Sequence, residues 1–273
     1  MASSPATSYV RTMFATTDHV AILAVPRRSQ TGVVQEVMRA GTLAQPDAQS
    51  RLQELNRQGY DVYCTVNSVK PNAQSRTKTD IADVRRLQLD LDDNGRQGLA
   101  KLRADVDAGR VPSPAVVMQS SKGRFQVLWH TVPGAWTPAA AEATMMRLAN
   151  AYGGDRVVTD VARVMRLPGF ANHKEGRDGW VVTWARYDGP RTMQADFRAL
   201  PQPDKASITQ IIEHRSRRRN REAFQRQRQI GRRAVRRRPQ EFTHRTQTGG
   251  RTSAVGVRVD VLRACRSACT PCV

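Results

Sequence analysis

Apolar and polar side chains alternate along several short stretches of the chain, and this period of two is typical of β-strands. Residues 60–68 show it clearly, with Val62, Cys64 and Val66 on one face. Comparable patterns predict further strands at residues 19–25, 85–92, 115–119, 124–130 and 180–186. The segment 120–123 separates two of these strands and predicts a tight hairpin turn.

Other stretches have the spacing of helices. Residues 47–57 and 97–107 show it, and each is soon followed by a glycine. Thr137 is a suitable N-cap for a helix that starts at Pro138 and runs to about residue 152. Strands mixed with helices, with a hairpin in the middle, predict an α+β (mixed α/β) fold.

The patterned segments divide the chain into four parts. We expect a flexible N-terminus over residues 1–17, which are small and polar, and one globular domain over residues 18–201. Residues 205–239 favour a helical extension, because Arg and Gln are good helix formers and no proline interrupts them before Pro239. Residues 240–273 show no pattern of a fold, and we expect a disordered or atypical tail.

The charge is strongly positive. The formal net charge is +20 and the pI about 11.2, which indicates a polyanionic partner, most often nucleic acid. Between residues 205 and 238, thirteen Lys and Arg stand against two Glu. This segment is either a solvated helix or tail, or an arm that binds phosphates without sequence preference. The arginines that would bind DNA in such an arm are Arg217, Arg218, Arg219, Arg232, Arg233, Arg236 and Arg237.

The chain has no run of eighteen apolar residues, so we expect no transmembrane helix and no membrane partner. The start of the sequence lacks the charged and apolar blocks of a signal peptide, and we expect a cytoplasmic protein. Among the four cysteines, Cys64 lies in an apolar strand and is predicted to be a buried thiol. Cys265, Cys269 and Cys272 form a cluster that either binds metal or belongs to an unstructured end.

An acidic pair lies in the predicted strand 85–92. Asp90 and Asp92 are two residues apart, so their carboxylates share a face. Two carboxylates held close together repel each other, and a hard divalent cation would relieve that repulsion. The alternative is an ordinary strand end, because Asp93-Asn94-Gly95 is also typical of a turn.

Two further segments combine polar groups of the kind that bind phosphates. Asp160 follows two valines, with Arg166 and Lys174 downstream of it, and the turn at Pro168-Gly169 favours their approach to Asp160. In the hairpin, Lys122 and Arg124 flank a glycine that allows backbone N–H groups to approach a phosphate. Either segment taken alone could equally be a charged loop or a plain surface hairpin.

Taken together, the three segments resemble the RepB-type plasmid primases, a branch of the archaeo-eukaryotic primase superfamily. That family has an apolar-Asp-apolar-Asp strand, a Ser/Gly-rich hairpin, and an Asp followed by Arg-Leu-Pro-Gly-x-x-Asn-x-Lys. The matching segments here are residues 89–92, 121–129 and 160–174, within a resemblance that covers about residues 18–190. It implies a primase-type catalytic domain with a central, mostly antiparallel sheet flanked by helices, followed here by the basic helical extension.

The resemblance also implies roles for individual residues. Asp90, Asp92 and Asp160 would be the catalytic carboxylates that bind Mg²⁺ or Mn²⁺. Many superfamily members have a His where this chain has Gln126, which cannot carry a positive charge. The residues implied to contact the nucleoside triphosphate are Lys122, Arg124, Gln126, Arg166, Asn172 and Lys174.

The implied activity is that of a DNA primase, a nucleotidyltransferase that starts chains on single-stranded DNA for a plasmid, phage or mobile element. A replicative helicase or an initiator would be a further partner. The alternative is a non-catalytic DNA-binding replication or mobilisation accessory protein that keeps a primase-like domain, and the three carboxylates argue against it. A nuclease or relaxase would need a nucleophilic Tyr or a His cluster, and the five His residues are scattered.

Overall fold

The computed structural model describes residues 4–27, 32–177 and 179–202. The predicted helical extension, the tail, the seven arginines proposed to bind DNA and the C-terminal cysteine cluster all lie outside the described residues.

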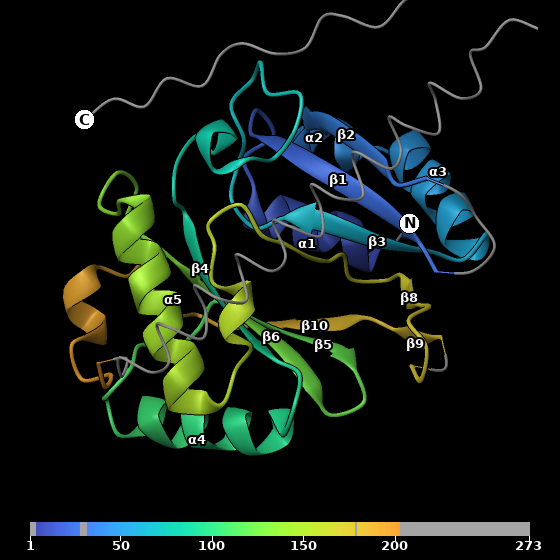
Figure 1. The fold of residues 1–273 in the computed structure, drawn as a ribbon. Helices are drawn as coiled ribbons and strands as arrows, with labels where there is room; N and C mark the ends of the chain where they lie inside the picture. The colour runs from blue at the N-terminus through green and yellow to red at the C-terminus, as the bar shows by residue number, and fades with distance from the viewer. Residues whose placement is uncertain (1–3, 28–31, 178, 203–273) are drawn as a thin grey trace, which may run out of the picture. The chain divides into compact units, whose positions relative to one another are not determined.

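The described strands form two four-stranded antiparallel sheets and a small two-stranded one (Figure 1). The first sheet has the order β2-β1-β3-β7 and contains β1 (His19–Pro26), β2 (Val34–Arg39), β3 (Tyr60–Thr65) and β7 (Val164–Arg166). The second has the order β10-β5-β6-β4 and contains β4 (Arg86–Leu91), β5 (Val116–Ser121), β6 (Arg124–His130) and β10 (Thr183–Arg186). The small sheet pairs β8 (Ala171–Asn172) with β9 (Trp180–Val181).

Helices accompany both sheets, which confirms the predicted α+β class. The α-helices are α1 (Pro5–Met13), α2 (Ala40–Leu43), α3 (Pro46–Arg57), α4 (Gly95–Asp107) and α5 (Pro138–Tyr152). Short 3₁₀ turns are η1 (Lys78–Asp80), η2 (Arg156–Val158) and η3 (Gln194–Phe197). As predicted, Thr137 caps α5, and its side chain accepts a hydrogen bond from the backbone N–H of Ala140.

The predicted strand 180–186 is divided in two, because Val182 leaves the ladder. Its N–H donates to the carbonyl of Phe170, and its carbonyl accepts from the N–H of Gly169. One half of the segment therefore pairs with β8, and the other half pairs with β5 of the second sheet.

The expectation of a flexible N-terminus is wrong for residues 5–13, which form α1. Ser4 caps the helix by accepting a hydrogen bond from the N–H of Thr7, and Pro5 occupies the first turn. Tyr9, Val10 and Met13 are buried, so α1 is part of the core. The small, polar composition of this segment hid an apolar stripe with helical spacing.

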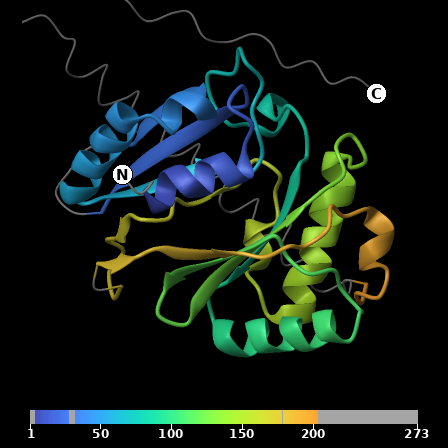
Figure 2. The ribbon, with the colours of Figure 1, turned by 180° about the vertical axis from the view of Figure 1, so that it is seen from behind.

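The two faces of β4 have different surroundings. Leu87, Leu89 and Leu91 are fully buried in a cluster with side chains of α4 and α5. The alternate positions, Gln88 and Asp90 among them, point to the other face. In both ribbon views α4 lies on the side of the second sheet away from the first sheet (Figures 1 and 2).

A second apolar cluster joins the first sheet to α1 and to the second sheet. It contains Ile22 and Cys64 of the first sheet and Met118 and Leu128 of the second. Burial raises the pKa of the Cys64 thiol to about 12, in agreement with its prediction as a buried thiol. The two sheets are thus held together by apolar contact.

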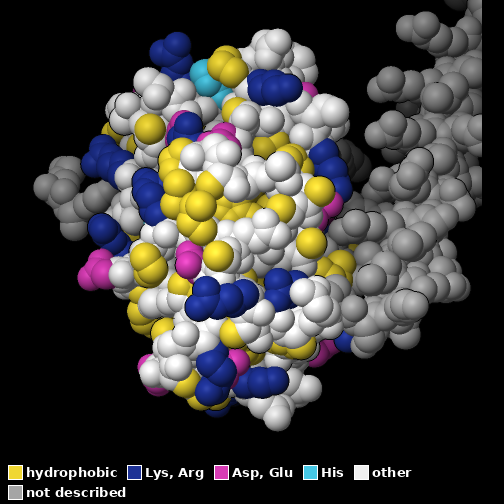
Figure 3. Space-filling model, turned by 90° about the vertical axis from the view of Figure 1, so that its left-hand side faces the viewer, with side chains coloured by type: hydrophobic (Ala, Val, Ile, Leu, Met, Phe, Trp, Pro, Cys, Tyr) yellow, Lys and Arg dark blue, Asp and Glu magenta, His cyan; other side chains and the backbone are white. Residues whose placement is uncertain are grey.

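On the side of the molecule that carries α5 and η3, hydrophobic side chains gather in the middle of the face, with Lys and Arg mostly around them (Figure 3).

No helix in the described ranges is long and apolar enough to cross a membrane.

The contact between α4 and β4 depends on Gly98, which generates a first prediction. A Cβ atom there would lie 2.4 Å from the carbonyl oxygen of Tyr152 and 2.9 Å from a methyl group of Leu91. We expect Gly98→Ala to lower the free energy of unfolding by about 1–3 kcal/mol through overpacking, although alanine favours helix. Urea denaturation measures this. The exposed neighbour variant Gln97→Ala is the control, and equal stability of the two variants would contradict this packing.

Candidate active site

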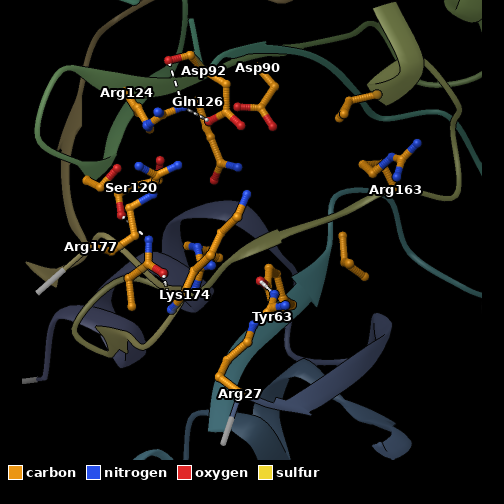
Figure 4. A pocket seen from close by; sticks show the side chains of 15 residues that line it. Arg27, Tyr63, Asp90, Asp92, Ser120, Arg124, Gln126, Arg163, Lys174 and Arg177 are labelled. Atoms are coloured by element: carbon orange, nitrogen blue, oxygen red, sulfur yellow. Dashed lines mark hydrogen bonds and ion pairs between the residues drawn. The ribbon is translucent and has the colours of Figure 1, made fainter. Parts of the chain in front are cut away.

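A polar cavity of about 220 Å³ takes its walls from both large sheets (Figure 4). Asp90 and Asp92 lie at one end, and the basic side chains of Arg27, Lys174 and Arg177 come from other elements. The remaining lining residues are Tyr63, Ser120, Ser121, Arg124, Gln126, Val158, Arg163, Val164, Arg166 and Asn172.

Asp90 is held under electrostatic stress. Its Oδ1 atom is buried and has no hydrogen-bond partner. Burial, and then the negative charges of Asp92 and Asp155, raise the pKa of Asp90 to about 7, against a smaller lowering by a hydrogen bond from Gln126. A cation between the carboxylates would remove this stress, so the acidic end of the cavity fits a divalent metal ion.

The register of β4 with β6 explains how this end is built. Asp90 lies directly opposite Gln126, and Leu91 lies opposite Phe125. Because Leu91 packs against the helices, alternation points Asp90 and Gln126 to the cavity face. The Oε1 atom of Gln126 is buried and unpaired, as is the Oγ atom of Ser121 at the end of β5.

The hairpin between β5 and β6 supplies one cation to the cavity. Arg124 donates from Nη1 to the carbonyl of Asp92 at 3.0 Å, and its guanidinium lies 3.6 Å from the carboxylates of both Asp92 and Asp93. Lys122 is exposed at the turn and does not line the cavity. Of the two basic hairpin residues selected from the sequence, only Arg124 reaches this cavity.

Arg166 and Arg27 form a basic wall together with Tyr63. The Arg166 guanidinium lies over the Tyr63 ring, 4.9 Å from its centroid. Arg27 donates from Nη2 to the Tyr63 hydroxyl at 2.8 Å. Both guanidinium groups also pair with the buried carboxylate of Asp61. The side chain of Lys174 lines the same cavity, between this wall and the carboxylates (Figure 4).

Asn172 connects two walls of the cavity. Its Nδ2 donates to the carbonyl of Ser120 at 2.9 Å, and its Oδ1 accepts from the N–H of Lys174 at 3.1 Å. These bonds hold the end of β5 next to the loop that carries Lys174. The geometry therefore gives Asn172 a supporting contact with the protein in addition to its place in the lining.

Asp160 does not line the cavity. Its carboxylate pairs with Arg163 at 2.6 Å, whereas Arg166 and Lys174 line the cavity together with Asp90 and Asp92. Within the ranges that the structure describes, no three His, Cys, Asp or Glu side chains are grouped closely enough to hold a metal.

Asp155 is a carboxylate near Asp90 that the sequence analysis missed. Its N–H donates to the carbonyl of Asp90 at 2.8 Å, and its charge contributes to the raised pKa of Asp90. A Cβ atom on the preceding Gly154 would lie 2.5 Å from a methyl group of Leu89, so only glycine allows this approach to β4. The Gly153-Gly154-Asp155 sequence was the available signal.

Arg27, Tyr63 and Arg177 were also missed. They belong to segments that carry no motif, and the fold alone brings them to the cavity. Ser120 and Arg163 lie in the hairpin and in the segment after Asp160, which the sequence had already singled out, and both line the cavity. Ser121 lies in a quoted segment, but its unpaired hydroxyl became apparent only from its burial.

The family model described as "RepB DNA-primase N-terminal domain" matches residues 29–218, which is more than half of the chain. The chain belongs to the RepB primase family. No curated protein sequence gives a significant match.

Solved primase structures have the same fold as this RepB-family chain. The AEP domain of the cyanophage S-2L primase-polymerase has 18% identity and a TM-score of 0.54, covering 72% of this chain and 97% of its own. Primase RepB′ has 19% identity and a TM-score of 0.52, covering 84% and 68%. The catalytic domain of primase RepB′ in complex with initiator DNA has 18% identity and a TM-score of 0.51, covering 78% and 98%.

The raised pKa of Asp90 generates a second prediction, concerning stability. A carboxyl whose pKa is higher in the folded state than in the unfolded state destabilises the fold increasingly as the pH rises from about 4 to about 7. We expect Asp90→Asn to raise the free energy of unfolding at pH 8 by about 1–4 kcal/mol, since a tenfold change in proton affinity corresponds to about 1.4 kcal/mol.

The same substitution should change stability little at pH 3, where the carboxyl is mostly protonated in both states. Thermal unfolding in EDTA at the two pH values measures the difference. Asp93→Asn is the control, because the Asp93 side chain is 94% exposed. A gain that is the same at both pH values would contradict the assignment of strain to the Asp90 charge.

Proposed function

We propose that this RepB-family chain is a DNA primase that joins nucleotides on a single-stranded DNA template. The observation that carries the proposal is the cavity in which an unpaired, buried carboxylate faces a wall of arginine and lysine side chains. Nucleotidyl transfer needs both parts, because it handles metal ions and a triphosphate at one place.

The acidic end is suited to Mg²⁺ or Mn²⁺, which Asp90 and Asp92 would hold through carboxylate oxygens. When bound, these ions supply charge stabilisation for the attacking hydroxyl and the leaving pyrophosphate. Gln126 lies directly opposite Asp90 and lowers the pKa of that carboxyl, while the Oδ1 atom of Asp90 has no partner and is free for such an ion. Gln126 thus acts on Asp90 through a neutral amide.

The basic wall is suited to the triphosphate. Arg166, Lys174 and Arg124 are among the cavity residues that could donate charge-assisted hydrogen bonds to phosphate oxygens. Ser121 has a hydroxyl that is buried without a partner on the same cavity, and it would add a neutral donor. Lys122, exposed at the hairpin turn, and Asn172, which bridges Ser120 and Lys174, are proposed as neighbouring contacts to the nucleotide.

A DNA template is the expected polyanionic partner. One solved relative in fold is a primase catalytic domain in complex with initiator DNA. The net charge of +20 favours phosphate contacts and an affinity that falls steeply as salt increases. We propose a role in replication of a plasmid, phage or mobile element, together with a helicase or initiator.

The first test of the proposal is primer synthesis on single-stranded DNA with labelled nucleotides and Mn²⁺ or Mg²⁺. The double variant Asp90→Ala/Asp92→Ala should lose at least about 10³-fold in rate, because metal-assisted charge stabilisation is worth several kcal/mol. Asp93→Ala is the matched control and should retain activity.

Synthesis that survives in the double variant would refute the site. If the unmodified chain binds DNA but incorporates no nucleotide on varied templates, it is instead a binding protein with a primase-like domain.

Two residues compete for the role of third carboxylate. Asp160 is the residue that the family motif implies, and Asp155 is the one whose charge acts on Asp90. The Asp155 carboxylate accepts a hydrogen bond from the N–H of Val157 at 2.8 Å, and Asp160 forms an ion pair with Arg163. Because the charge of Asp155 raises the pKa of Asp90, we expect Asp155→Asn to reduce synthesis more than Asp160→Asn does, by about tenfold or more. Rates at saturating Mn²⁺ for both variants decide it, and a larger loss in Asp160→Asn would restore the motif-based assignment.

A further inference from the structure

Asp61 is a charged residue in the interior, outside every motif of the sequence. It lies in β3 between the apolar positions of that strand, and its side chain is 0% exposed. A buried carboxylate is costly unless several donors satisfy it. The surroundings of Asp61 therefore have to supply those donors.

Four groups donate to Asp61. The Tyr63 hydroxyl, from the same strand, donates to Oδ2 at 3.3 Å, and the other three come from separate parts of the chain. Arg166 reaches it from β7 with two nitrogens, at 2.8 Å and 2.9 Å. Arg27, which follows β1, donates from Nε at 2.5 Å. The backbone N–H of His173 donates to Oδ1 at 2.7 Å. The carboxylate thus joins the end of β1, β7 and the loop after β8.

The negative charge of Asp61 and the positive charges of Arg27 and Arg166 stabilise one another. Burial raises the pKa of Asp61, but the hydrogen bonds and positive charges of Arg166 and Arg27 outweigh it, and the pKa is lowered overall. Two guanidinium groups directed to one place would otherwise repel each other. The single negative charge of Asp61 lets both remain there and leaves the wall with a net positive charge.

The same carboxylate also acts on the loop that carries Lys174. The His173 N–H bonds to Asp61, the next N–H bonds to the side chain of Asn172, and Asn172 bonds to Ser120. Lys174 is thus the residue next to His173, whose backbone N–H is hydrogen-bonded to Asp61. Asp61 does not line the cavity, whereas Arg27, Arg166 and Lys174 do.

We propose that Asp61 is the positioning residue of the triphosphate-binding wall, which it preorganises by holding Arg27, Arg166 and the Lys174 loop at the cavity. This inference rests on the proposed function, since it takes the triphosphate as the ligand of that wall. It assigns to Asp61 no contact with substrate.

The test is direct binding of tripolyphosphate and of a non-hydrolysable nucleoside triphosphate with Mg²⁺ to the full chain, measured by calorimetry. Asp61→Asn keeps the shape of the side chain but removes its charge. We expect at least about a tenfold weaker binding of both ligands, the effect typical of losing a group that orients ligand-binding residues. Binding is measured below the unfolding temperature of every variant.

Asp18→Asn is the matched control. Asp18 is another mostly buried aspartate paired with an arginine, Arg85, at 2.9 Å, and neither residue lines the cavity. We expect this variant to lose stability but to bind both ligands as the unmodified chain does. A general loss of stability would weaken binding in both variants alike.

A double-variant cycle separates positioning from a purely structural role. If Asp61 acts through Arg166, then Asp61→Asn should weaken binding less in an Arg166→Gln background than in the unmodified chain. Equal effects in the two backgrounds, or unchanged binding in Asp61→Asn, would overturn the inference. Failure of the unmodified chain to bind either ligand would instead refute the proposed function.

Discussion

The structure depends on one unfavourable interaction, the burial of Asp90 beside other carboxylates. Leu89 and Leu91 pack against helices on one face of β4, and this packing directs Asp90 to the opposite face, where one of its oxygens has no partner. The strain is visible in its pKa of about 7. The apolar core therefore provides the free energy that keeps this carboxylate in place before any ligand arrives.

The basic wall on the opposite side of the cavity holds several cationic side chains close together, although they repel one another. Arg27 and Arg166 share the buried carboxylate of Asp61, and Arg166 also stacks on Tyr63. The basic wall contains a buried counter-charge, Asp61. At the acidic end Arg124 lies 3.6 Å from the carboxylates of Asp92 and Asp93, but the Oδ1 atom of Asp90 has no partner. We propose that a metal ion completes this end.

Membership of the RepB primase family agrees with a cavity that has one acidic end and one basic wall. The family match covers residues 29–218, and the solved primases of the same fold are under 20% identical to this chain. At such low identity, the roles proposed for individual site residues are supported by the geometry of this structure alone. The departure at Gln126 is an example, because the amide lies opposite Asp90 and lowers its pKa but cannot supply the positive charge of a histidine.

The sequence by itself determined the elements with strong periodicity, such as β6 and α5, and the two carboxylates of β4, because alternation and capping are local properties. It missed α1, whose apolar stripe lies among small polar residues. Only the tertiary structure decided which distant groups meet. The pairing of β1 with β3 brings Arg27 and Asp61 to the region of the cavity. The close approach of Gly154 to β4 brings Asp155 there. Both are contacts between distant segments, which no local sequence pattern encodes.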